Sequence, residues 1–92
     1  DLSTEEGCEF LIQKSVELLG GIDTVILNHI IGFFKNWMDV PHSDRYSLVQ
    51  KIFHVNSFSY FHLALSALPF LNVTNGHLGV VSSVAGRMGI PM

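Results

Sequence analysis

Polar side chains interrupt otherwise apolar segments at three points, and their types suit the chemistry of a ligand site. Asn28 and His29 follow a short apolar run, and Asn56 lies within a long one. Ser82 and Ser83 follow a second short run. If the short runs are parallel strands, these groups meet beyond the carboxyl ends of the strands, where α/β sheets bind ligands. On the local rule alone, an asparagine at a strand end is more often a cap or turn residue.

The first part of the chain is typical of a helix followed by a strand. Ser3 and Glu6 form a capping-box pattern, and apolar residues then recur at helical spacing. Gly20 and Gly21 supply the positive φ that ends a helix, so we expect a helix over residues 4–19. Residues 23–28 are short and apolar on both faces, as in a strand that helices cover on both sides.

The second part repeats this order. We expect a helix over about residues 44–68, capped by Ser43 or Asp44, with Pro69 near its end. It is apolar nearly all round, which predicts burial on both sides. A turn over residues 72–76 precedes a second strand over residues 79–83. Helix, strand, helix, strand is the order of an α/β fold, here part of a Rossmann-like, doubly wound parallel sheet.

Composition narrows the class of protein. Hydrophobic residues make up 48% and charged residues 14%, with a mean hydropathy of +0.37; an average soluble domain has about 25% charged residues. Asparagine and histidine within the most apolar stretch argue against a membrane span. The net charge of −3 gives no basic patch for nucleic acid. We therefore expect residues 1–92 to form the interior of one larger domain, incomplete at both ends.

Several other residues are better explained by structure than by chemistry. The five histidines have no metal-ligand spacing, so we expect no metal site. Cys8 fits a small core residue. The aromatic residues Phe33, Phe34 and Trp37 fit local packing in a loop. Ser83 is not in a Gly-x-Ser-x-Gly nucleophile elbow.

Four segments together resemble the short-chain dehydrogenase/reductase family. They are Gly20-Gly21-Ile22-Asp23-Thr24-Val25-Ile26-Leu27-Asn28-His29-Ile30, Val55-Asn56-Ser57-Phe58-Ser59-Tyr60, Leu68-Pro69 and Val80-Val81-Ser82-Ser83-Val84-Ala85-Gly86-Arg87. Asn-His-Ile stands where the family usually has Asn-Asn-Ala-Gly, and in this the chain is similar to the 11β-hydroxysteroid dehydrogenase type 1 and type 1-like subfamily. The resemblance covers essentially the whole chain.

The resemblance implies a nicotinamide cofactor, NADP or NAD, with NADP favoured. Asp1 resembles the acidic residue beside the adenine, with Leu2 next to it. Asn28, His29 and Ile30 resemble the segment that lines the ribose and nicotinamide.

The resemblance also implies two catalytic residues. Asn56 matches the helix asparagine of the Asn-Ser-Tyr-Lys tetrad, whose backbone carbonyl holds a water of the proton relay. Ser83 matches the serine that hydrogen-bonds the substrate oxygen. The family's tyrosine and lysine would come after Met92, and its Gly-rich turn before Asp1. Gly79 replaces a β-branched strand residue, and the loop between Ile31 and Asp44 is a few residues longer than in similar members.

The implied function is oxidation or reduction of hydroxyl or carbonyl groups on steroid-like, lipophilic substrates. A homodimer and a place in the lumen of the endoplasmic reticulum are implied for the complete form. The triplet Asn72-Val73-Thr74 is a glycosylation sequon, which weakly favours the lumen. The alternative is a non-catalytic truncated or degenerate product that at most associates with other chains through its long helix.

Overall fold

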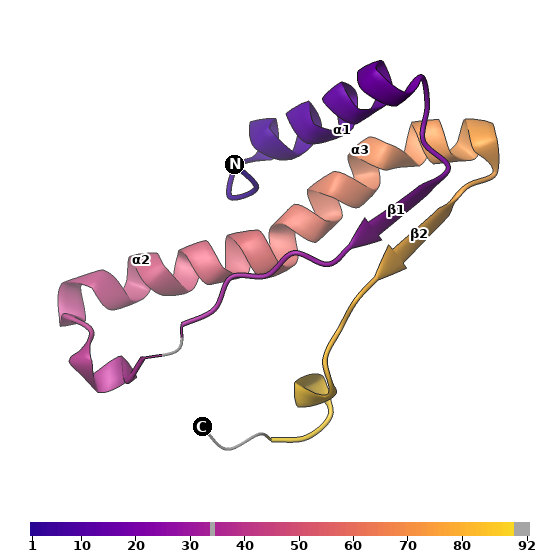
Figure 1. The fold of residues 1–92 in the computed structure, drawn as a ribbon. Helices are drawn as coiled ribbons and strands as arrows, with labels where there is room; N and C mark the ends of the chain where they lie inside the picture. Colours follow the sequence, from indigo (N-terminus) through magenta and orange to yellow (C-terminus); the bar gives the residue numbers. More distant parts are fainter. Residues whose placement is uncertain (34, 90–92) are drawn as a thin grey trace.

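The computed structural model describes residues 1–33 and 35–89, arranged as two helical segments against a two-stranded sheet (Figure 1). Helix α1 spans Glu5–Leu19 and strand β1 spans Thr24–Leu27. A short 3₁₀ turn at Trp37–Asp39 leads to α2 at His42–Phe53, a π-helical turn at His54–Phe58 and α3 at Ser59–Thr74. Strand β2 spans His77–Val80, and a 3₁₀ turn follows at Val84–Gly86. The α/β fold expected from the sequence is confirmed.

The start of α1 differs from the capping-box expectation. Thr4, not Ser3, is the N-cap, and its Oγ1 accepts a hydrogen bond from the Gly7 amide at 3.0 Å. Ser3 instead donates from both its amide and its hydroxyl to the carboxylate of Asp1, at 2.9 and 2.7 Å. The competing acceptor at Asp1 therefore moves the cap by one residue. The end of the helix is as expected, because Gly20 takes a left-handed conformation with φ 77°.

The second helical segment is longer than expected, since it begins at His42 and ends at Thr74. Pro41 precedes it without a side-chain cap, so the expected cap at Ser43 or Asp44 is wrong. Pro69 lies inside α3 rather than ending it. The helix ends instead where Asn75 adopts a left-handed conformation with φ 52° and the Gly76 amide donates to the Leu71 carbonyl at 2.8 Å. Of the turn predicted over residues 72–76, only Asn75 and Gly76 lie outside the helix.

The two strands are parallel, with Thr24 opposite His77 and Leu27 opposite Val80. Strand β2 begins two residues earlier than expected, because the His77 amide already donates to the Asp23 carbonyl at 2.9 Å. It ends at Val80 instead of Ser83, because the last hydrogen bond to the segment of β1 is donated by the Val81 amide. Both strands run in the same direction, so they end at the same edge of the sheet (Figure 1).

One face of the sheet carries the core. Seven residues from α1, α3, β1 and the segment before β1 form a buried cluster, in which Cys8 and Ala67 have no exposed surface. Leu27 is 4% exposed, whereas its neighbour Ile26 on the other face is 65% exposed. The expectation that helices cover both faces is therefore not met within the described residues. The cluster comprises Cys8, Ile12, Ile22, Leu27, Leu63, Ala67 and Leu71.

The long helix is buried along one stripe only, contrary to the expectation of burial on both sides. Leu63, Ala67 and Leu71 face the core, while Phe61 and Leu65 are 71% and 63% exposed. The chain has 7084 Å² of accessible surface, against about 5,300 Å² for a folded monomer of its mass. Its radius of gyration of 16.0 Å likewise exceeds the roughly 12 Å of a compact domain of this length. Exposed apolar side chains that recur along one helix, as Phe61 and Leu65 do, are typical of an interface.

No helix among the described residues is long and apolar enough to cross a membrane.

The glycine at the start of β2 yields a stability prediction. A Cβ at Gly76 would overlap the Asp23 carbonyl oxygen and lie 2.8 Å from Cδ2 of Leu71. We expect Gly76→Ala to lower the free energy of unfolding by about 1–3 kcal/mol, as overpacking does. The measurement is urea unfolding of the protein that carries this chain.

Gly79→Ala is the matched control, because the nearest atom to its Cβ would be Cγ1 of Ile26 at an ordinary 3.8 Å. We expect this variant to be as stable as the parent. Equal loss of stability in both variants would contradict the proposed close approach at Gly76.

Candidate functional site

A cavity of about 400 Å³ lies at the edge of the sheet where both strands end. Its volume is in the range of small-molecule sites. The segment that follows β1, the end of β2 with the residues after it, and the long helical segment all contribute to it, so groups 20 or more positions apart in the sequence meet here. The lining residues are Asn28, His29, Ile30, Asn56, Tyr60, Val80, Val81, Ser82 and Ser83.

The side chain of Asn56 ties the long helix to the segment that leaves β1. Its Oδ1 accepts from the Ile31 amide at 2.9 Å, and its Nδ2 donates to the Ile31 carbonyl at 2.6 Å. Asn56 lies in the π-helical turn, a rare irregularity that occurs frequently at functional sites. Ile31 lies beyond the end of β1 and has no partner strand in the described part of the chain, so the Asn56 amide group forms the two backbone hydrogen bonds that a neighbouring strand would form. These bonds fix the path of residues 28–31.

A second set of contacts fixes His29. The hydroxyl of Tyr60 donates to the His29 carbonyl at 2.7 Å, and the two rings lie 4.5 Å apart. Nε2 of His29 lies 2.6 Å from Oγ of Ser59, which is 1% exposed. Both the backbone and the ring of His29 are therefore held by α3.

The hydrogen bonds of Ser59 assign the tautomer of His29. Oγ of Ser59 also lies 2.5 Å from the Val55 carbonyl, which can only accept. Because a hydroxyl has one proton, Ser59 donates it to Val55 and must accept from His29. The proton of a neutral His29 is therefore on Nε2, which leaves Nδ1 as an acceptor.

Ser83 lies two residues beyond the last hydrogen bond of the sheet, in which the Val81 amide donates to Leu27 at 2.9 Å. Oγ of Ser83 accepts from the Ala85 amide at 3.1 Å and caps the following 3₁₀ turn. Accepting this bond leaves the hydroxyl proton of Ser83 available to donate to a ligand. The cap and the functional interpretation of this serine are compatible.

The structure does not bring Asp1 and Leu2 into this cavity. The carboxylate of Asp1 is bonded to Ser3, and Leu2 packs against the core cluster. The Leu2 carbonyl accepts a weak bond from Sγ of Cys8 at 3.7 Å, and burial raises the pKa of this thiol. The interpretation of Cys8 as a core residue is confirmed, and the adenine assignment of Asp1 and Leu2 stays a prediction.

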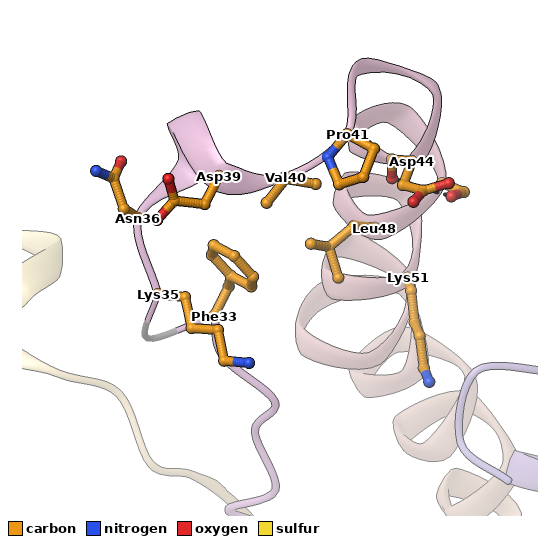
Figure 2. A pocket seen from close by; sticks show the side chains of 10 residues that line it. Phe33, Lys35, Asn36, Asp39, Val40, Pro41, Asp44, Leu48 and Lys51 are labelled. Carbon is orange, nitrogen blue, oxygen red and sulfur yellow. Dashed lines mark hydrogen bonds between the residues drawn. The ribbon is translucent and has the colours of Figure 1, made fainter.

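A larger cavity of about 520 Å³ lies elsewhere, between the loop after β1 and the first turns of α2. Figure 2 shows Phe33 from the loop and Leu48 from α2 pointing across it. The rings of Phe33 and Trp37 lie 4.6 Å apart, as expected for local packing, whereas Phe34 lies outside the described residues. Two lysines and two aspartates line this larger cavity, so its charged side chains carry no net charge. We assign the site to the strand ends, because hydrogen-bonded polar groups converge there. This second cavity is lined by Phe33, Lys35, Asn36, Asp39, Val40, Pro41, Asp44, Ser47, Leu48 and Lys51.

Within residues 1–33 and 35–89, no three histidine, cysteine or acidic side chains are grouped so that they could hold a metal ion.

Ser59 and Tyr60 were not predicted from the sequence to belong to the site. They follow Asn56 by three and four positions, so they lie on the same face of the helix. A search for polar residues at this spacing from Asn56 would have found them.

Two substitutions of Asn56 test its two hydrogen bonds to Ile31 separately. Asn56→Ala should cost about 1–3 kcal/mol, because it leaves both polar groups of Ile31 without their partner. Asn56→Asp should be destabilised at neutral pH, where a carboxylate cannot donate to the Ile31 carbonyl. Protonation restores a donor, so the folded state favours the protonated form and the deficit should narrow as the pH falls. Urea unfolding at several pH values measures the loss of stability in both variants, and hydrogen exchange of the Ile31 amide measures the loss of its partner in Asn56→Ala.

Ser57→Ala is the control, because Ser57 is the exposed neighbour of Asn56. Unchanged protection of the Ile31 amide from hydrogen exchange in Asn56→Ala would contradict the proposed role of the Asn56 side chain.

Comparison with known proteins agrees with the geometry. The sequence profile of the family described as short chain dehydrogenase matches residues 1–92. The Hydroxysteroid 11-beta-dehydrogenase 1-like proteins of Xenopus tropicalis and Gallus gallus are 36% and 38% identical to this chain. In each case the match covers 99% of this chain and 30% of the relative. The chain therefore spans less than a third of the length of these curated relatives.

Solved structures share the fold. An alcohol dehydrogenase from Thermococcus sibiricus, complexed with 5-hydroxy-NADP, has a TM-score of 0.75 and 25% identity, over 99% of this chain and 37% of its own. Carveol dehydrogenase from Mycobacterium avium, in complex with NAD, has a TM-score of 0.75 at 21% identity, over 99% of this chain and 32% of its own. With the profile match over its whole length and the parallel sheet that these enzymes share, this chain belongs to the short-chain dehydrogenase family.

Proposed function

We propose that the protein carrying this chain is an NAD(P)-dependent oxidoreductase that interconverts hydroxyl and carbonyl groups. The observation that carries the proposal is that Asn28, Asn56 and Ser83 line one cavity together at the carboxyl edge of the sheet. In open α/β sheets this edge is the place of ligands. Membership of the short-chain dehydrogenase family supports a nicotinamide cofactor, and the NADP and NAD complexes of the similar structures leave both open.

The lining of the cavity fits the nicotinamide end of such a cofactor. Ile30, Val80 and Val81 offer apolar surface for the face of a ring, and Asn28 and His29 offer hydrogen bonds to polar substituents. When bound, the cofactor supplies or accepts a hydride. The contacts from Ser59 and Tyr60 hold His29 before any ligand arrives, which lowers the cost of ordering the site.

The chain supplies two of the groups that such a reaction needs. The free hydroxyl proton of Ser83 is proposed to hydrogen-bond the substrate oxygen and to orient it. Asn56 is proposed to support the proton relay through its backbone carbonyl, with its side chain committed to Ile31. The tyrosine that would act as acid and base in this family, with its lysine, is not found as Tyr-x-x-x-Lys in these 92 residues.

The substrate is proposed to be steroid-like and lipophilic, because relatives with 36% and 38% identity are named Hydroxysteroid 11-beta-dehydrogenase 1-like proteins. We further propose a homodimer and a place in the lumen of the endoplasmic reticulum for the complete form. The exposed apolar face of α3 supports the first, and the resemblance of the sequence to the 11β-hydroxysteroid dehydrogenase type 1 subfamily supports the second.

An association module is the second candidate function. The exposed residues Phe61, Leu65 and Leu68 of α3 favour it, because they recur at helical spacing on one face. A natural protein that forms a stable complex through this face and shows no cofactor-dependent turnover would favour this candidate over the oxidoreductase.

Substitution of the two serines tests the oxidoreductase. We expect Ser83→Ala, in the protein that carries this chain, to lower kcat by about 10²–10³, the usual effect of losing one hydrogen bond to a reacting oxygen. Cofactor affinity should stay unchanged, because the proposed role is toward the substrate. Steady-state kinetics and cofactor titration measure the two effects separately.

Ser82→Ala is the matched control, one position earlier at the same strand end. We expect nearly parental turnover from it. The reverse result, with Ser82 essential and Ser83 dispensable, would contradict the assignment.

A further inference from the structure

The last turn of α3 carries the one asparagine of this chain that begins an Asn-x-Ser/Thr triplet. Five asparagines occur, and only Asn72 has a threonine two positions later and no proline between. The side chains of Asn36 and Asn56 are bonded to the backbone, and Asn75 is the left-handed residue that ends the helix. Among the described residues, Asn72 has no such structural task.

The fold presents Asn72 to solvent. The preceding Leu71 is 5% exposed and belongs to the core, whereas the following Val73 is 85% exposed. Asn72 is itself exposed. A large polar group on its Nδ2 would therefore displace nothing from the core.

Asn72 also lies far along the fold from the candidate site. The end of α3 is at the edge of the sheet where β1 and β2 begin, opposite the edge where the cavity lies (Figure 1). A bulky group here would leave the cavity open.

From these observations we infer that Asn72 is an N-glycosylation site. The inference rests on the proposed lumenal location. In the reaction, Nδ2 of Asn72 forms a bond to the anomeric carbon of an oligosaccharide carried on a polyprenyl pyrophosphate. The bond from that carbon to the pyrophosphate oxygen breaks, and the pyrophosphate leaves with the electron pair. One amide proton passes to a base of the transferase.

The structure also sets the order of events. Oγ1 of Thr74 donates to the Ile22 carbonyl at 2.9 Å and approaches the Leu71 carbonyl at 3.3 Å. The hydroxyl of the sequon is therefore engaged in the folded chain, and the triplet is helical. Transfer must precede the folding of this turn. The glycan then remains on the exposed side while Thr74 closes its contact with Ile22.

The test is expression in mammalian cells of the protein that carries this chain. The readout is a peptide containing position 72 that releases an N-glycan on enzymatic treatment, with conversion of the asparagine to aspartate detected by mass spectrometry. We expect the glycan in the parent protein and in Thr74→Ser, which keeps the hydroxyl. We expect its complete loss in Asn72→Gln and in Thr74→Ala. Asn75→Gly is the control, because it keeps the left-handed helix end and leaves the triplet intact.

A second arm separates the site from the location. The same protein is directed to the lumen by a cleavable secretion signal and carries a reference sequon on a C-terminal tag. A glycan on Asn72 only in this form would support the site and overturn the lumenal location of the natural protein. A glycan on the tag without one on Asn72 would overturn the site itself.

Purified, folded and unglycosylated protein offered to the transferase should stay unmodified at Asn72. Efficient modification of that folded protein would overturn the order of events inferred from Thr74.

Discussion

The packing of α3 against α1 and β1 is the contact on which the rest of the structure depends. Ala67 of α3 and Cys8 of α1 have no exposed surface, and both belong to the buried cluster in which α3 meets α1 and β1. Because α3 covers one face of the sheet and returns the chain to its starting edge, β1 and β2 must run in parallel. Parallel strands end together, so this apolar stripe decides where the polar residues of the site meet.

The site itself depends on an irregular point in the same helix. At the π-helical turn His54–Phe58 the helix presents Asn56 to the backbone of Ile31, and the first residues of α3 present a serine and a tyrosine to His29. These contacts hold residues 28–31, which follow β1 and form no hydrogen bonds to a neighbouring strand among the described residues. The buried hydroxyl of Ser59 is bonded on both sides, to His29 and to the Val55 carbonyl, and a buried polar group that is satisfied in this way favours one arrangement. In the proposed function, the hydroxyl proton of Ser83 and Nδ1 of His29 are the groups that remain to bind a ligand.

The sequence predicted those parts of the fold that follow from local chemistry. Gly20 ends α1 because only a left-handed residue fits there, and the apolar runs form parallel strands. The helix from His42 to Thr74 exceeded its predicted end, because Asn75 ends it and Pro69 is accommodated within it. Asn56 was identified in the sequence as a polar residue within a long apolar segment, but its partner Ile31 is 25 positions away and could not be predicted from spacing. The exposure of one face of the sheet was not predicted, because burial depends on which other segments pack against that face, and the apolar pattern of a strand does not show this.

The most direct test of the account is the position of a nicotinamide cofactor in a crystal structure of the protein that carries this chain. The account predicts the nicotinamide ring in the cavity at the strand ends, against Ile30 and with Oγ of Ser83 on the side where a substrate oxygen would lie. A cofactor bound instead in the cavity between Phe33 and Leu48, or a nicotinamide turned away from Ser83, would contradict it.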